Sequence, residues 1–169
     1  MGGVLEHLLL FVFPFAMAFA AATDLLTMKI PNALTLGLAA AFLVAAPVAG
    51  LAWPELLSHL GAGALLLILG IILFSLGWVG GGDAKLLAAA ALWLGFDPLL
   101  PFLSLVTIFG GALAIVLLAY PNVPATALPL PYWAVRLHAK GGAMPYGVAI
   151  AAGALTIYPS TAWYGALAG

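Results

Sequence analysis

The sequence predicts an all-α membrane protein, a single bundle of about six transmembrane helices of which the fourth is short. Of its 169 residues, 66% are hydrophobic and only 5% are charged, and the mean hydropathy is +1.27. A water-soluble domain carries roughly 25% charged residues to keep its surface wetted. Since four basic and five acidic side chains cannot cover such a surface, lipid must be the solvent. We expect one integral-membrane domain over residues 1–169, without a separate soluble domain.

Long apolar segments give the helices in order. A helix needs about 20 mostly apolar residues to cross the hydrocarbon core. The first segment lacks the basic start of a signal peptide and is expected to be retained. The short helix is bounded by three glycines before it and by Asp97-Pro98 after it, which are typical helix boundaries. The expected full spans are 4–24, 33–52, 56–77, 98–120 and 144–167, with the short helix near 84–96.

The basic residues indicate the orientation. Lys29, Lys85, Arg136 and Lys140 all fall on one side of the predicted bundle, whereas Glu6, Glu55 and Asp97 fall on the other. Basic residues favour cytoplasmic loops. The segments 23–32, 78–84 and 121–143 are therefore expected in the cytoplasm, with the N- and C-termini outside it.

Several classes of function are excluded. The chain has no cysteine, which rules out thiolate chemistry and cysteine-bound zinc. A net charge of −1 without a basic block argues against nucleic acid as a partner. No group of His, Asp and Glu has metal-ligand spacing, and the serines lack a His–Asp pairing signal. We therefore expect no metal and no cofactor.

Two acidic residues remain on the expected cytoplasmic side, Asp24 and Asp83, each at the end of a helix. A helix of about 13 residues covers only ~20 Å, so the short helix would start below the membrane interface. A carboxylate and irregular glycine backbone at that depth predict a small wet pocket. Two neighbouring carboxyl groups share a proton, so one can activate water while the other polarises a carbonyl. That is sufficient for peptide hydrolysis without a metal.

Other interpretations stay open on these residues alone. Asp83 could be a helix N-cap preceded by flexible glycines, and Asp24 a charge next to the membrane. The pair could also serve a proton- or cation-coupled transporter, or belong to a non-catalytic assembly or scaffold protein of the membrane. The proline-rich segment 121–143 could gate substrate entry or merely return the chain.

Three motifs resemble the type IV prepilin leader peptidase family. Asp24 is followed six residues later by Ile30-Pro31-Asn32, which resembles the first signature of that family. Gly80, Gly82, Asp83 and Lys85 resemble its Gly-x-Gly-Asp-x-Lys signature. Met144-Pro145-Tyr146-Gly147 resembles the Pro-Tyr/Phe-Gly element that opens the last helix.

The resemblance implies a membrane aspartic peptidase that removes the basic leader from a prepilin at the cytoplasmic face of the bacterial inner membrane. Asp24 and Asp83 would be catalytic, and Gly80, Gly82, Lys85, Pro31 and Asn32 would bind substrate or shape the site. Large members add a cysteine-containing cytoplasmic domain associated with N-methylation, which this chain lacks. It is similar to the short form serving tight-adherence (Flp) pili. The implied partners are a Flp-type prepilin, the lipid bilayer and the pilus assembly machinery.

Overall fold

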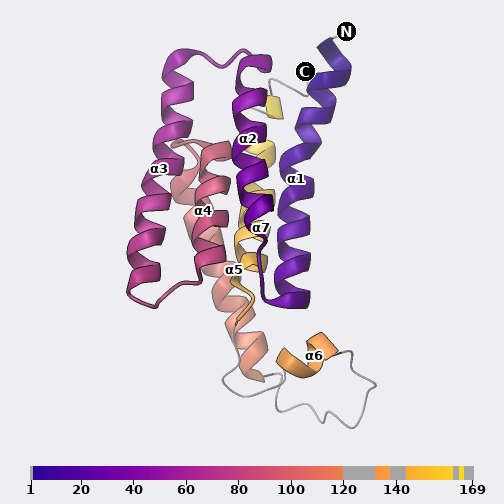
Figure 1. Ribbon diagram of the computed structural model, residues 1–169, viewed down its shortest axis with the longest axis vertical. Helices are drawn as coiled ribbons and strands as arrows, with labels where there is room; N and C mark the ends of the chain where they lie inside the picture. The colour runs from indigo at the N-terminus through magenta and orange to yellow at the C-terminus, as the bar shows by residue number, and fades with distance from the viewer. Residues whose placement is uncertain (1, 120–131, 138–143, 162–163, 166–169) are drawn as a thin grey trace.

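A computed structural model describes residues 2–119, 132–137, 144–161 and 164–165, and all regular structure in these ranges is helical (Figure 1). This confirms the predicted helical class. The elements are α1 (Gly2–Thr27), α2 (Asn32–Val48), α3 (Trp53–Ser75), α4 (Gly81–Leu94), α5 (Leu99–Ala119), α6 (Tyr132–Leu137), α7 (Tyr146–Ile157) and the 3₁₀ turn η3 (Tyr158–Ser160).

The long helices run up and down alongside one another. α3 packs on α4, and α7 packs on both α1 and α5, while α2 contacts α4 and α1. The α1–α2 connection, the α3–α4 connection and the start of α7 all lie toward the lower end of the bundle in Figure 1. Residues that are far apart in the sequence therefore meet at this end.

Three helical segments are long and apolar enough to cross a membrane: Leu8–Thr27, Trp53–Ser75 and Leu99–Ala119. α2 is apolar but shorter, and α4 has 14 residues, in agreement with a short fourth helix. Large apolar side chains such as Phe15, Ile68 and Leu118 are exposed. Lipid is the solvent that such a surface requires. Six complete crossings and the orientation of the ends remain predictions.

Aromatic side chains hold α4 at the centre of the bundle. Trp93 is fully buried, and its ring lies 5.6 Å from that of Phe13 on α1 and 6.1 Å from that of Phe42 on α2. Its indole N–H donates to the carbonyl of Leu38 at 2.9 Å. A buried indole needs such an acceptor. The contact fixes the height of α4 against α1 and α2.

The structure corrects several helix boundaries, among them the end of α2, which lies at Val48 instead of residue 52. The last helix, expected over 144–167, ends at Ile157. Pro159 has no backbone N–H with which to continue the α-helical hydrogen bonds, and the chain continues from Tyr158 as η3. The short helix begins at Gly81 instead of residue 84, so that two of the three glycines are helical.

The segment 121–143, expected to be a loop, contains a helix, α6. The rest of that segment lies outside the described residues, as do 162–163 and 166–167 of the expected last span.

Candidate active site

Asp24 lies in the last turn of α1 and is only 6% exposed. The helix ends at Thr27, because Met28 adopts a left-handed backbone (φ 55°) and donates its N–H to the Asp24 carbonyl at 2.8 Å. A left-handed residue is a common helix terminator. The Asp24 side chain is consequently presented from a fixed helix end.

The carboxyl group of Asp24 is bound by the first turn of α7. Its Oδ2 accepts the backbone N–H of Gly147 at 2.8 Å, in a buried contact between residues 123 positions apart. The first amides of a helix have no partner within the helix, and they bind carboxylates well. This bond joins the end of α1 to the start of α7.

Position 147 requires glycine because the side chains of Asp24 and Ile30 approach its backbone closely. A Cβ there would stand 2.8 Å from Asp24 Oδ2 and 2.9 Å from Ile30 Cδ1. Ile30 is also contacted from α4, since a Cβ at Gly82 would lie 3.2 Å from Ile30 Cβ. The Ile30 side chain is thus held between the starts of α4 and α7.

Asp83 is the third residue of α4, whose N-cap is Gly80. Its half-buried carboxyl group accepts a hydrogen bond from the backbone of Gly80. A Cβ at Gly80 would stand only 2.8 Å from Asp83 Oδ2. Asp83 is therefore not the N-cap residue, although its side chain does bind the backbone of the N-cap residue, Gly80.

The carboxyl groups of Asp24 and Asp83 are close enough to interact electrostatically. The first comes from the end of α1 and the second from the start of α4. The structure thus brings together the two acidic residues that the sequence places on one face of the membrane.

Ligand pockets in proteins measure roughly 300–1,000 Å³, and the hollow at Asp83 measures about 610 Å³. Asp83, Gly80 and Thr107 are polar elements of its wall, which is otherwise mostly apolar. Its other lining residues are Leu73, Trp78, Val79, Leu87, Leu103, Val106, Met144, Tyr146 and Ile150, contributed by α3, α4, α5, α7 and the segments beside them. The acidic group therefore faces a space that can hold an apolar peptide.

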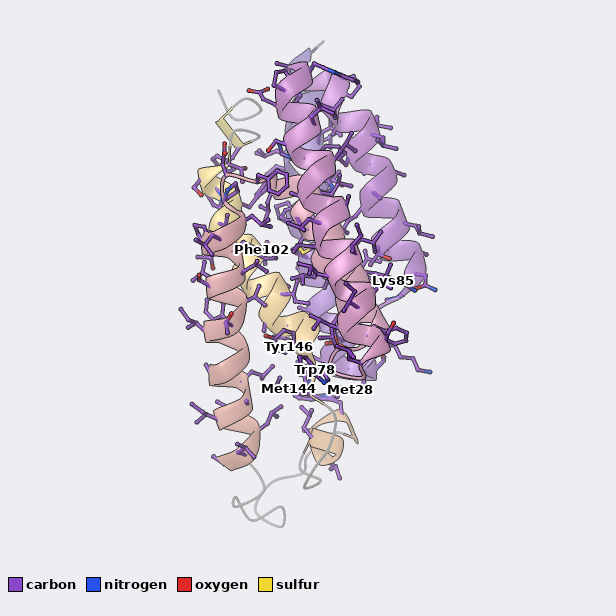
Figure 2. The ribbon with its side chains drawn as sticks, turned by 90° about the vertical axis from the view of Figure 1, so that its left-hand side faces the viewer. Met28, Trp78, Lys85, Phe102, Met144 and Tyr146 are labelled. Carbon is purple, nitrogen blue, oxygen red and sulfur yellow. The ribbon has the colours of Figure 1, made fainter. Side chains whose placement is uncertain are left out.

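Tyr146 lines this cavity. It lies near enough to Asp83 to interact with it electrostatically, and its ring packs so tightly on α5 that a Cβ at Gly110 would stand 2.6 Å from Cε2. Figure 2 shows Tyr146, Met144 and Trp78 gathered at the same end of the molecule. Tyr146 and Gly147 were absent from the site residues inferred from the sequence, although the Pro-Tyr-Gly element was visible there.

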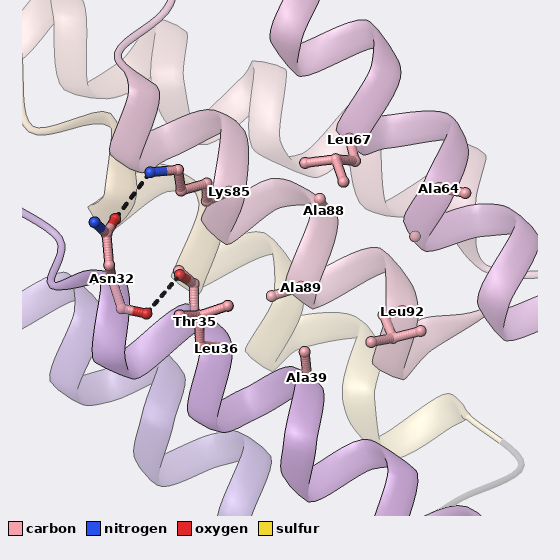
Figure 3. Close-up of a pocket in the computed structure, with 11 residues that line it drawn as sticks. Asn32, Thr35, Leu36, Ala39, Ala64, Leu67, Lys85, Ala88, Ala89 and Leu92 are labelled. Atoms are coloured by element: carbon pink, nitrogen blue, oxygen red, sulfur yellow. Dashed lines mark hydrogen bonds between the residues drawn. The ribbon is translucent and has the colours of Figure 1, made fainter.

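Lys85 and Asn32 join the two aspartate motifs without lining the cavity at Asp83. The exposed Lys85 Nζ donates to Asn32 Oδ1 at 2.9 Å (Figure 3). Pro31 precedes α2 in an extended conformation, with φ −62° and ψ 135°. Of the site-shaping residues inferred from the sequence, Gly80 contacts Asp83 and Gly82 packs on Ile30. Pro31 and Asn32 lie at the start of α2, where Asn32 binds Lys85 of α4.

A helical bundle with an apolar exterior and two acidic side chains meeting at one end defines a membrane protein with a carboxylate site. Within the described ranges, no three His, Asp or Glu side chains are grouped so as to hold a metal ion. The sequence profile of the type IV leader peptidase family matches residues 11–115, and the chain belongs to that family. It is thus an integral membrane protein of a protease family that acts on leader peptides.

The matched range contains both aspartates and ends before Tyr146 and Gly147. No curated protein and no solved structure matches the chain in the other two comparisons.

Proposed function

We propose that the protein is a short-form prepilin peptidase, an aspartic endopeptidase that removes the basic leader from Flp-type prepilins. Asp24 and Asp83 are the catalytic pair. The observation that supports this proposal is that the two carboxyl groups, from the end of α1 and the start of α4, lie close enough at one end of the bundle to interact electrostatically. One of them is tied to α7 through the Gly147 amide, and the other opens onto a cavity.

In the proposed reaction, the two aspartates share one proton, because like charges at short range cannot both ionise easily. The ionised carboxylate takes a proton from a water molecule, whose oxygen forms a bond to the scissile carbonyl carbon. The protonated carboxyl group donates a hydrogen bond to the carbonyl oxygen. The C–N bond then breaks, and a proton passes to the departing amine. The Gly147 amide orients Asp24 throughout, without contacting substrate.

The cavity at Asp83 supports an apolar substrate. It lies between two packed pairs of helices, α3 with α4 and α5 with α7. Its apolar walls suit the hydrophobic helix that follows a prepilin leader, while Asp83 lies at the end where that helix would begin. Gly80 leaves room for a peptide backbone next to the carboxyl group. Gly82, Pro31, Asn32 and Lys85 shape the site from outside this cavity.

We place the protein in the bacterial inner membrane with the aspartates toward the cytoplasm, because the leader to be removed is basic and cytoplasmic. Single cysteines are informative in this cysteine-free chain. A cysteine at Met28 is expected to be shielded from an impermeant thiol reagent applied to intact cells, whereas one at Pro54 is expected to react. The reverse pattern would contradict the orientation.

Cleavage by the purified protein tests the proposed activity. The full chain in detergent, incubated with a Flp-type prepilin, is expected to release the leader, and mass spectrometry of the product identifies the new N-terminus. A precursor with its basic leader residues neutralised serves as the specificity control. Intact precursor after incubation with folded protein, together with proton or cation flux in vesicles, would instead support a transporter.

A further inference from the structure

A second hollow lies on the other side of α4, in the surface formed by α2, α3 and α4. This groove has a volume of about 490 Å³ and is lined almost entirely by apolar atoms. Small side chains create it, among them Ala39 on α2, Ala64 on α3 and Ala88 on α4. Asn32, Thr35 and Lys85 form its only polar end (Figure 3). Neither Asp24 nor Asp83 lines this groove.

The polar end carries a positive charge that no lining carboxylate balances. The Lys85 ammonium has three N–H donors, of which the structure directs one to Asn32 Oδ1 at 2.9 Å. None of the eleven lining residues is acidic. The side chain is exposed, so its other donors can reach an external acceptor. The groove therefore combines an apolar trough with a cation held at one end.

We propose that this groove binds one anionic phospholipid, with the phosphate at Lys85 and Asn32 and an acyl chain along the small residues of α2, α3 and α4. Charge complementarity supports this occupant, since basic pockets between membrane helices bind anionic headgroups. Lys85 comes from the same helix start as Asp83, at the membrane end where headgroups are expected. The volume also falls in the range of small-molecule sites.

The positive charge at the polar end disfavours a prepilin as the occupant of the groove. A prepilin carries a basic leader next to its apolar helix under the proposed function. Seating that helix in the groove would bring the leader toward Lys85, and like charges at such a contact are unfavourable. A neutral lipid would fill the trough but leave the ammonium without its anion. An anionic phospholipid satisfies both parts of the groove.

Binding of defined lipids to the purified full chain tests the proposal. Native mass spectrometry is expected to show about fivefold tighter binding of phosphatidylglycerol than of phosphatidylcholine. Lys85→Gln is expected to bring this ratio close to one, Lys85→Arg to keep it, and Lys29→Gln, which changes an exposed lysine outside the groove, to leave it unchanged. No preference in the unaltered protein, or equal loss in both glutamine variants, would overturn the proposal.

Filling the groove provides a second test that does not depend on charge. Ala64 is exposed, so Ala64→Leu should fold, and it is expected to weaken phosphatidylglycerol binding severalfold. Ala40→Leu is the matched control, because Ala40 is exposed on α2 but does not line the groove. Equal affinity in the Ala64 and Ala40 variants would contradict an acyl chain in the trough.

Photocrosslinking identifies the occupant in membranes. A benzophenone attached to a cysteine at Ala64 is expected to give a phospholipid adduct on irradiation in phosphatidylglycerol vesicles. If the main adduct instead contains a co-reconstituted prepilin or a second copy of the chain, the lipid assignment is overturned. The phospholipid adduct does not depend on peptidase activity and is expected in the Asp24 and Asp83 variants as well. The lipid site and the peptidase function can therefore be refuted independently.

Discussion

Gly147→Ala is expected to impair the protein far more than a glycine-to-alanine change ordinarily does. The added Cβ would stand 2.8 Å from Asp24 Oδ2, 2.9 Å from Ile30 Cδ1 and 3.1 Å from Asp24 Cβ. Asp24 Cβ cannot rotate away, because it belongs to the last turn of α1, which the hydrogen bond from the Met28 N–H to the Asp24 carbonyl closes. The start of α7 must move away, and the 2.8 Å hydrogen bond between the Gly147 amide and Asp24 is then lost.

The magnitude follows from three contributions. Overpacking a tight contact costs about 1–3 kcal/mol, and loss of a hydrogen bond to a charged group about 1.5–3 kcal/mol. The greater helix propensity of alanine offsets about 0.5–1 kcal/mol. The net free energy of unfolding should fall by roughly 2–5 kcal/mol. A displacement of about 1 Å at Asp24 should lower the cleavage rate about 100-fold in the molecules that remain folded.

Thermal unfolding in detergent and a prepilin cleavage assay measure the two effects. Gly111→Ala is the matched control, because Gly111 lies on α5 and a Cβ there meets nothing within 4 Å. This control should unfold at the same or a slightly higher temperature and cleave normally. Normal stability and normal cleavage in Gly147→Ala would refute the assigned role of the amide.

Three further predictions concern packing and chemistry. Gly70→Ala should destabilise the fold by about 1–3 kcal/mol in thermal unfolding, because its Cβ would lie 2.9 Å from Ala84 Cβ and 3.3 Å from Ala84 Cα. Gly37→Ala is the control and should not destabilise the fold, because a Cβ at Gly37 meets nothing within 4 Å. Tyr158→Phe removes a buried 3.0 Å hydrogen bond to the Leu10 carbonyl and should lower unfolding stability by about 1 kcal/mol, and unchanged stability would argue against that bond. A chelator should leave the cleavage rate unchanged, since the described residues hold no metal-binding cluster, whereas activity lost to a chelator and restored by zinc would contradict a metal-free site.

Much of the fold could be predicted from the sequence because the pattern is strong along the chain. Long apolar segments separated by turn residues give the helices directly, and the glycines near 81 indicated a short α4. The early end of α7 also had a local signal in Pro159, but the apolar run beyond it favoured a full span. The local sequence thus predicted the presence of the helices better than the residues at which they end.

Only part of the candidate site could be predicted from the sequence. Asp24 and Asp83 stand out because carboxylates are rare in this chain. The contact between Asp24 and Gly147 joins α1 to α7, and its existence depends on how those helices pack, which no local pattern reports. Lys85 illustrates the opposite case, since it belongs to the same motif as Asp83 yet lines a different hollow. Residues two positions apart on a helix of 3.6 residues per turn point to nearly opposite faces.

The most direct test of the account compares prepilin cleavage by the unaltered protein with cleavage by Asp24→Asn, Asp83→Asn and the double variant. Asparagine keeps the size of each side chain and removes only the titrating group. If the two carboxyl groups act as one unit, each single variant should fold normally and lose cleavage as completely as the double variant. Full processing by either folded single variant would show that its carboxyl group is dispensable, and the catalytic pair would be wrong.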